Sequence, residues 1–355
     1  MNDTRQFFLN HSKIDVYFKQ SKDDFVVTEV PLYEMSGDGE HLILTLRKKD
    51  LSTWDAVNIL SNHLGCRSRD IGYAGLKDKN AMTIQKISVH KSLEEKVHSF
   101  EHPQIKILNT EYHNNKIRIG HLKGNKFFIR LKRVFPNDAL KLKKVLKEIN
   151  KHGMPNYFGV QRFGVEGNNH LKGEAIINGE LKEKNRKLKQ MFLNAYQSNL
   201  FNNWLSKRIE LSKLINTFTP QELHENMAYD KEIITQAKQQ PHPFKIFEGD
   251  LIEHYPFGRL FYGEDLQSEA EKFNQRDRVP TGLLPGKRVK LAKGYARTLE
   301  EPYDKKTFED GSRRYAWVFP EEIESHYNED ERHFELNFFL PKGSYATEFI
   351  RELIH

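Results

Sequence analysis

The chain has 355 residues, 37% hydrophobic content and a formal net charge of +7 at pH 7, which describes a folded, basic protein large enough for two domains. The positive charge favours a polyanionic partner such as nucleic acid, although an ordinary basic enzyme fits the same charge. A single cysteine, Cys66, excludes an intramolecular disulfide and a cysteine-rich zinc module.

The N-terminal part of the chain combines strand-like and helical patterns. Residues 24–30 are rich in β-forming side chains, and the leucines within residues 42–46 recur with a period of two, so both stretches predict strands. Ser52 or Thr53 is a suitable cap for the helix that follows. Because another strand-like run covers residues 84–89, this part of the chain predicts an α+β arrangement.

The turn between that helix and that strand carries the first candidate catalytic residue. Asp78 lies between Lys77 and Lys79, and nearby positive charges keep a carboxylate ionised. An ionised aspartate on a loop can act as a nucleophile or a base. The triplet has low specificity by itself, because most Lys-Asp-Lys turns are simply solvated.

Residues 105–133 predict a hairpin and a further strand. Lys116 and Arg118 alternate with isoleucines, and farther on Arg130 and Lys132 alternate with apolar side chains. Such strands form a sheet with one apolar and one basic face, and the basic face either lies along phosphates or is solvated. The sequence alone leaves both possibilities open.

The pattern changes beyond Gly153, where a lysine-rich helix ends. A loop rich in glycine and asparagine follows, then a long basic helix over about residues 188–214 and polar, irregular sequence. Residues 333–340 alternate again, as the first part of the chain does. We therefore predict a discontinuous domain of residues 1–153 and 312–355, interrupted by an inserted α/β domain over residues 154–311.

Several familiar motifs are missing from the sequence. It contains neither a P-loop nor a Gly-x-Gly-x-x-Gly motif after a strand. None of the 16 histidines belongs to a His-Glu-x-x-His motif, and there is no Gly-x-Ser-x-Gly turn. The lack of an 18-residue apolar run or a signal-peptide core predicts a cytoplasmic protein without membrane contact. We therefore expect either chemistry without a nucleotide, metal or other cofactor, or binding without chemistry.

Five blocks, in matching order along the chain, resemble the tRNA pseudouridine synthase D family. The block around Asp78 looks like the catalytic motif of that family, and the Pro-Asn-Tyr-Phe-Gly stretch beginning at Pro155 is similar to its most recognisable signature. The five blocks are residues 24–29 with 37–41, 74–85, 123–127, 155–164, and 340–347 with 351–353.

The resemblance implies both a fold and an activity. The fold would be a pseudouridine-synthase-like catalytic domain, in which helices flank a mixed and largely antiparallel sheet, together with an inserted domain. The activity would be the cofactor-free isomerisation of a uridine in tRNA, typically uridine 13, to pseudouridine. Asp78 would be the nucleophile.

The resemblance also implies roles for residues around the target base. Phe127 would pack on the base, and Asn125 would hold the catalytic loop or the nucleotide. Lys19 matches a basic residue near the catalytic aspartate, and Tyr345 falls where a phenylalanine is expected against the base. Strand alternation alone would select Phe128 as the stacking residue, because Phe128 shares the basic face, whereas the resemblance selects Phe127.

Further residues are candidates for contact with RNA, and other functions remain open. Lys77, Lys79, Gln161 and Arg162 are the contact candidates, although Gln161 and Arg162 would equally well hold a domain junction. The alternative function is a non-catalytic tRNA- or RNA-binding protein on the same scaffold. A cofactor-free glycoside hydrolase would need a second carboxylate near the nucleophile. We expect tRNA as the partner and a monomer as the default oligomeric state.

Overall fold

The computed structural model describes residues 5–18, 21–77, 79 and 81–355, and these form two compact units. The sheet unit comprises the described residues of 14–144 together with 320–343, and the helical unit comprises residues 5–13, 145–319 and 344–355. The chain therefore returns to the sheet unit late and leaves it again for the last helix. The domain division predicted above, with an insertion over residues 154–311, places its boundaries elsewhere and stays a prediction.

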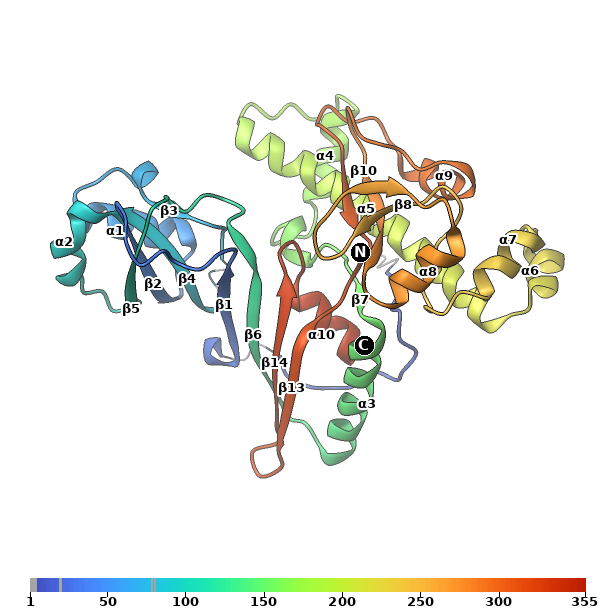
Figure 1. Ribbon diagram of the computed structural model, residues 1–355, viewed down its shortest axis with the longest axis horizontal. Helices are drawn as coiled ribbons and strands as arrows, with labels where there is room; N and C mark the ends of the chain where they lie inside the picture. Colours follow the sequence, from blue (N-terminus) through green and yellow to red (C-terminus); the bar gives the residue numbers. More distant parts are fainter. Residues whose placement is uncertain (1–4, 19–20, 78, 80) are drawn as a thin grey trace. The chain divides into compact units, whose positions relative to one another are not determined.

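The sheet unit is built on an eight-stranded sheet in the order β13-β14-β6-β1-β4-β2-β5, with β3 beside β4 (Figure 1). The pairing of β1 with β4 is parallel and the other pairings are antiparallel, which confirms the predicted mixed, largely antiparallel sheet. The strands are β1 Phe25–Pro31, β2 His41–Lys49, β3 Gly72–Tyr73, β4 Met82–His90, β5 Ile105–His113, β6 Leu122–Lys132, β13 Glu321–Asn328 and β14 His333–Pro341.

Helix α1 (Thr53–Leu64) forms where its caps predict it. The Ser52 side chain accepts a hydrogen bond from the backbone N–H of Asp55, and Asp55 in turn accepts one from the backbone N–H of Ser52. Gly65 ends the helix with a left-handed φ of 66°. The buried side of α1 packs on apolar residues of β2 and β4, and the short helix α2 (Glu94–His98) contributes Val97 to the same core.

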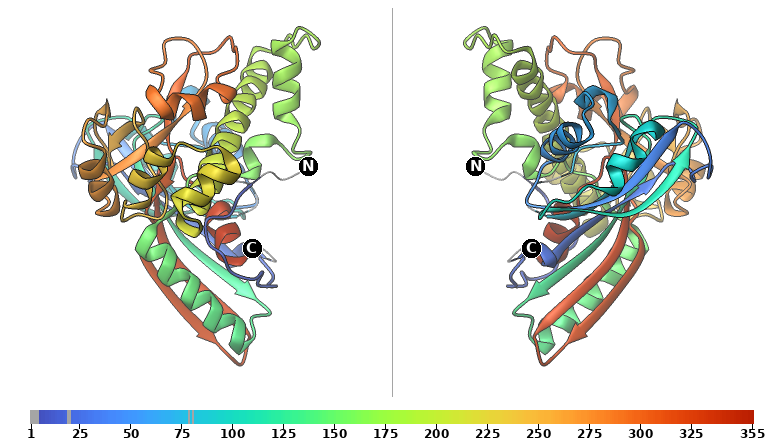
Figure 2. Two further views of the ribbon diagram at one scale, coloured as in Figure 1. Left: turned by 90° about the vertical axis from the view of Figure 1, so that its right-hand side faces the viewer. Right: turned by 90° about the vertical axis from the view of Figure 1, so that its left-hand side faces the viewer.

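Helix α3 (Pro136–His152) belongs to the sheet unit up to Lys144 and to the helical unit beyond it. Figure 2 shows the long β13–β14 hairpin with the start of α3 beside it. The Tyr327 hydroxyl of β13 donates a hydrogen bond of 2.9 Å to the carbonyl of Val134, just before α3, and so ties the hairpin to the helix start.

The helical unit is organised around the 32-residue helix α5 (Arg186–Thr217), which confirms the long helix predicted from sequence. Trp204 of α5 packs in an aromatic core with Trp317 and Phe244, and Arg208 forms a buried bidentate ion pair with Asp250 at 2.7 and 2.8 Å. The other helices are α4 Asn169–Ile177, α6 Pro220–Met227, α7 Lys231–Lys238, α8 Leu266–Asn274, α9 Gly294–Glu300 and α10 Ala346–Ile354.

The helical unit also contains two small sheets. One has the order β11-β10-β8-β9 and the other pairs β12 with β7, so the unit mixes helices with strands. The strands are β7 Met154–Pro155, β8 Leu251–His254, β9 Leu260–Tyr262, β10 Arg278–Leu284, β11 Ser312–Tyr315 and β12 Trp317–Val318. Together the two units confirm the α+β class predicted from the sequence.

Candidate active site

The predicted site residues are divided between the two units. Asp78 and Lys19 lie outside the described residues. Four others, Lys77, Lys79, Asn125 and Phe127, belong to the sheet unit, and Gln161, Arg162 and Tyr345 belong to the helical unit.

Strand pairing determines which side chains share a face of the large sheet. On β6, Asn125 lies opposite Glu29 of β1, and Phe127 lies opposite Val27 of the same strand. Directly opposed residues of an antiparallel pair point to the same face. Asn125, Phe127 and Glu29 therefore share one face, whereas Phe128 points to the other, where its ring lies 5.4 Å from the Arg130 guanidinium.

Lys77, the residue before Asp78, is held by buried contacts on that first face. Its amino nitrogen lies 2.8 Å from Glu29 Oε2, and the two side chains are 6% and 1% exposed. Its backbone N–H donates a hydrogen bond of 2.9 Å to Thr53 Oγ1 at the start of α1, and Thr53 donates one of 3.1 Å to Gln85 on β4. The charge of Lys77 is therefore directed at Glu29, and both its main chain and its side chain are anchored.

Three buried polar atoms of this region lack hydrogen-bond partners among the described residues. They are Asn125 Oδ1, Gln85 Nε2 and Thr83 Oγ1. Thr83 of β4 pairs in register with Val27, which places it on the same face as Phe127. Because buried polar atoms are nearly always hydrogen-bonded, these three atoms mark a place where further polar groups belong.

Phe127 is packed rather than freely exposed. Its ring stacks on that of Phe338 in β14, with centroids 5.3 Å apart and an interplanar angle of 23°, and the ring of Phe25 lies 6.2 Å away. The Phe127 side chain keeps only 7% of its surface open. These neighbours fix the orientation of the ring and leave little of its surface to a ligand.

The basic residues of the opposite face are paired with acids. Arg130 contacts Glu335 at 2.8 Å, and Lys132 lies 2.7 Å from Asp24. Burial opposes ionisation of Asp24, but hydrogen bonds from Lys132 and Ser21 outweigh it and hold the pKa of Asp24 below its usual value. This face is therefore largely neutralised, and the predicted basic strand face does not form there.

Lys79 and the segment of Lys116 and Arg118 are the remaining positions singled out in the sheet unit. Lys79 is exposed, and its contact with RNA stays a prediction. The strand predicted around Lys116 and Arg118 is wrong, because β5 ends at His113 and β6 begins only at Leu122. The segment between them is a loop with a turn at residues 119–120.

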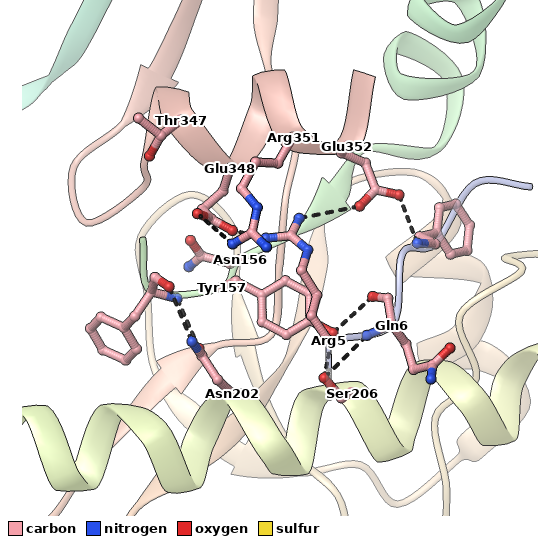
Figure 3. A network of polar contacts seen from close by, with 12 residues as sticks. Arg5, Gln6, Asn156, Tyr157, Asn202, Ser206, Thr347, Glu348, Arg351 and Glu352 are labelled. Carbon is pink, nitrogen blue, oxygen red and sulfur yellow. Dashed lines mark hydrogen bonds and ion pairs between the residues drawn. The ribbon is translucent and has the colours of Figure 1, made fainter. Parts of the chain in front are cut away.

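In the helical unit, the segment that begins at Pro155 is fixed by side-chain contacts to its main chain (Figure 3). Asn202 of α5 accepts a hydrogen bond from the Phe158 N–H and donates one to the Phe158 carbonyl, at 2.9 and 3.0 Å. The Tyr157 hydroxyl donates to the Gln6 carbonyl at 2.9 Å and contacts Ser206 Oγ at 2.9 Å. These contacts hold the segment against α5.

Helix α10 is joined to the N-terminal segment by a buried ionic network (Figure 3). Arg5 pairs with Glu348 and, at 3.5 Å, with Glu352. Glu352 also accepts hydrogen bonds from the N–H groups of Phe8 and Leu9, at 2.7 and 2.9 Å, and burial raises its pKa. The network fixes α10, and with it Tyr345, the N-cap residue of that helix.

Arg162 and Tyr345 lie beside one phenylalanine, Phe158, and Gln161 is hydrogen-bonded to α10, the helix that Tyr345 caps. The Arg162 guanidinium lies 5.3 Å from the centre of the Phe158 ring and the Tyr345 ring lies 6.2 Å from it. Gln161, an exposed residue, exchanges a hydrogen bond of 3.3 Å with Thr347 on α10. The structure thus brings together three residues that the sequence could only list separately.

Arg314 completes this cluster and was not identified from the sequence. Its guanidinium lies 3.9 Å from the centre of the Phe158 ring and 5.9 Å from that of Tyr345, and it donates to the Asn156 carbonyl at 3.0 Å. Burial lowers the pKa of Arg314 to about 10. The sequence signal was weak, because Arg314 is one of two adjacent arginines in a polar stretch.

Neither a metal site nor a membrane-spanning segment is found in the part of the chain that the structure describes. No group of three or more histidine, cysteine, aspartate or glutamate side chains in it is arranged to hold a metal ion. None of its helices is both long and apolar enough to cross a bilayer.

Comparison with known proteins identifies the family. The family model for tRNA pseudouridine synthase D (TruD) matches residues 2–186 and 181–353. The chain belongs to the tRNA pseudouridine synthase D family. Proteins of that name from Sulfurimonas denitrificans and Nitratiruptor sp. are 53% and 54% identical to it, over 98% and 99% of this chain and 98% of each relative. The curated members of the tRNA pseudouridine synthase D family are isomerases.

A solved structure confirms the fold of the family. A Methanosarcina mazei protein assigned to tRNA pseudouridine synthase D matches with a TM-score of 0.70 at 23% sequence identity, over 98% of this chain and 95% of that one. The family and the fold class predicted from the five blocks are therefore confirmed. The roles of individual residues stay predictions.

Proposed function

We propose that this protein converts uridine 13 of tRNA to pseudouridine without a cofactor, with Asp78 as the nucleophile. The observation that carries the proposal is family membership along nearly the whole chain, with relatives about half identical that are named tRNA pseudouridine synthase D. The assignment of Asp78 rests on the resemblance of residues 74–85 to the catalytic motif of the family. The basic net charge of +7 agrees with a polyanionic substrate.

The reaction is an isomerisation in which no atom is gained or lost. The glycosidic bond to N1 of uracil breaks, and a bond forms from the sugar to C5 of the same base. C5 loses a proton and N1 gains one. Asp78 attacks either the sugar or the base while the base is detached, and it is released when the base is reattached through carbon.

Several contacts of the sheet unit support this role for the loop of Asp78. The Lys77–Glu29 ion pair and the hydrogen bond from Lys77 to Thr53 anchor the residue that precedes the nucleophile. Asn125 Oδ1, which lacks a partner among the described residues, is suited to hold the loop or the nucleotide. Electrostatic stabilisation of Asp78 by Lys77 is weakened by Glu29, so exposed Lys79 is the better candidate for that task.

Phe127 supports recognition of the base. Removing a base from its stack costs a few kcal/mol, and stacking on an aromatic side chain returns about 1–3 kcal/mol. Phe127 lies on the face that also carries Asn125, whereas Phe128 lies on the other face. This arrangement favours Phe127 over Phe128 as the stacking residue. Gln161, Arg162 and Tyr345 are proposed as contacts from the helical unit.

The test is incubation with tRNA, followed by carbodiimide labelling and primer extension to map pseudouridine. We expect wild-type protein to modify one uridine and Asp78→Ala to modify none. Asp70→Ala is the matched control, because Asp70 is an exposed residue of the same unit, at the end of a short 3-10 helix, and pairs with Arg67. Wild-type rates in Asp78→Ala would overturn the nucleophile assignment, and tight tRNA binding without modification by the intact protein would indicate a non-catalytic RNA-binding protein.

A further inference from the structure

A polar hollow of about 360 Å³ lies in the sheet unit, where the turn between β5 and β6 meets the segment after β1. None of the predicted site residues that the structure describes, including Phe127 and Asn125, lines it. Its lining consists of Tyr33, Glu34, His113, Asn115, Lys116, Arg118 and His121.

The hydrogen bonds of His121 determine where its proton lies. Its Nδ1 accepts a backbone N–H of Arg118 at 3.4 Å, so Nδ1 itself carries no proton. The Tyr33 hydroxyl therefore donates to the same nitrogen at 2.7 Å, and burial raises the pKa of Tyr33, which keeps that hydroxyl protonated. An imidazole that accepts at Nδ1 carries its proton on Nε2, which is therefore a donor.

His113 is fixed in the same tautomer by different partners. Its Nδ1 accepts the backbone N–H of Ser36 at 3.1 Å. The Ser36 hydroxyl, also 3.1 Å from that nitrogen, donates its hydrogen bond to the carbonyl of Asp38 at 2.8 Å. The Nε2 of His113 is therefore a second donor, and neither Nε2 has a hydrogen-bond partner among residues 5–18, 21–77, 79 and 81–355.

Positive charge accompanies these two donors. The Arg118 side chain is exposed and makes no hydrogen bond or ion pair within the described part of the chain. The Lys116 amino group donates one hydrogen bond to the Arg69 carbonyl at 2.7 Å and has two further N–H groups for a ligand. Glu34 is the single acid among the described residues of the lining, which therefore carry a net positive charge and an excess of donors. An oxyanion is the ligand that this combination suits.

The hollow is linked to the segment that leads to the proposed nucleophile. The Gly120 N–H donates to the Ala74 carbonyl at 2.8 Å, and Ala74 precedes Asp78 by four residues in the sequence. A Cβ placed on Gly75 would lie 3.8 Å from the Lys77 amino group and 3.9 Å from the side chain of Leu122, the residue after His121. A ligand of the hollow therefore contacts the turn that borders the reactive loop.

We propose that this hollow binds a backbone phosphate of the tRNA near the target nucleotide, through Arg118, Lys116 and the Nε2 donors of His113 and His121. The inference rests on the proposed function for its substrate, but it concerns binding rather than chemistry. Ile119, which is 77% exposed beside Arg118, provides an apolar contact for the adjoining sugar or base.

The first test measures tRNA affinity between 50 and 200 mM salt for wild type, Arg118→Gln and the control Arg332→Gln. Arg332 is in the same unit, at the turn between β13 and β14, and does not line the hollow. We expect Arg118→Gln to weaken binding about tenfold and to reduce the salt slope by about 1, which is the effect of losing one phosphate contact. Under single turnover, the half-saturating tRNA concentration should rise while the rate at saturation stays within about twofold.

The second test uses His121→Asn, which keeps an acceptor near the Nδ1 position for Tyr33 and Arg118 but removes the Nε2 donor. It should weaken tRNA binding without changing the unfolding midpoint. Unchanged affinity and salt slope in both Arg118→Gln and His121→Asn would overturn the proposal, even if the protein makes pseudouridine normally. If both variants bind tRNA more weakly than wild type, but the wild-type protein makes no pseudouridine, the phosphate site would stand and the proposed function would be refuted.

A titration with inorganic phosphate distinguishes a phosphate group of the tRNA from a free phosphate ion as the ligand of the hollow. Titration with phosphate, against chloride at equal ionic strength, should shift the imidazole NMR signals of His113 and His121 only at millimolar concentrations and should be competed by tRNA. Phosphate binding that tRNA does not compete would show a site for the free ion and would overturn the assignment to RNA.

Discussion

Replacing Glu29 by glutamine removes the carboxylate that lies 2.8 Å from the Lys77 amino group, in a place where the two side chains are 1% and 6% exposed. The lysine is then left as a buried charge without its counter-ion. Removing one partner of a buried ion pair costs about 3–5 kcal/mol of unfolding free energy. Because the neutral pair Glu29→Gln with Lys77→Met leaves no buried charge, the double variant should recover at least about 1 kcal/mol relative to the sum of the single changes.

The assay is equilibrium urea unfolding, with hydrogen exchange of peptides from β1 and β4 to report on the sheet unit by itself. The matched control is Lys126 with Glu322, an ion pair of the same sheet at 2.6 Å whose side chains are 53% and 59% exposed. An exposed pair contributes at most about 1 kcal/mol, so its double-mutant cycle should be close to additive. Coupling between Glu29 and Lys77 below about 0.5 kcal/mol, no larger than in the control, would refute the structural argument.

The same variant has an expected consequence for activity. Lys77 directly precedes Asp78, and a misplacement of a reacting group by about 1 Å costs roughly 100-fold in rate. Glu29→Gln should therefore lower the single-turnover rate at saturating tRNA far more than it changes tRNA affinity. If Lys77 instead acts by binding RNA, affinity would fall and the saturated rate would not.

Other parts of the structure give further predictions. Gly159→Ala should destabilise the helical unit by about 1–3 kcal/mol and weaken tRNA binding, because the added Cβ would lie 2.9 Å from the Tyr345 ring; unchanged urea unfolding would contradict this. Asp24 has a pKa below its unfolded value of 3.8, so its stabilising contribution is fully present above that value and is lost as the pH falls through the folded pKa. Asp24→Asn should therefore flatten the acid limb of the stability curve measured by urea unfolding. Asp250→Asn should cost about 3–5 kcal/mol of unfolding free energy, because it leaves the buried guanidinium of Arg208 without its carboxylate.

Local sequence patterns correctly predicted those helices and strands that also find packing or pairing partners in the fold. Helix α1 begins where Ser52 provides a cap, and β14 forms where apolar residues alternate over residues 333–340. The alternation at residues 116–119 has the same period, yet these residues form a loop between β5 and β6 and pair with no strand. A period of two predicts a strand only when pairing is available, and pairing is a property of the whole sheet.

The site was predictable as a set of motifs but not as a set of contacts. The family blocks indicated the segment of Lys77 and the strand of Phe127, whereas the partner of Lys77 is Glu29, 48 residues earlier in the chain. Likewise, the charge of Arg130 is neutralised by Glu335, more than two hundred residues later. Whether a lysine or arginine meets RNA or a carboxylate depends on such distant neighbours, which sequence spacing does not reveal.

Because β14 pairs with β6, the sheet cannot be completed until the last part of the chain has been synthesised. About 200 residues separate the end of β6 at Lys132 from the start of β14 at His333. At typical translation rates of about 5–20 residues per second, β6 waits roughly 10–40 s on the ribosome for the strand that covers its edge. In that interval its apolar residues and unpaired backbone groups form an open sheet edge of the kind that pairs with other chains. The late return of the chain to this sheet therefore leaves β6 exposed to wrong strand pairing for most of the synthesis of the chain.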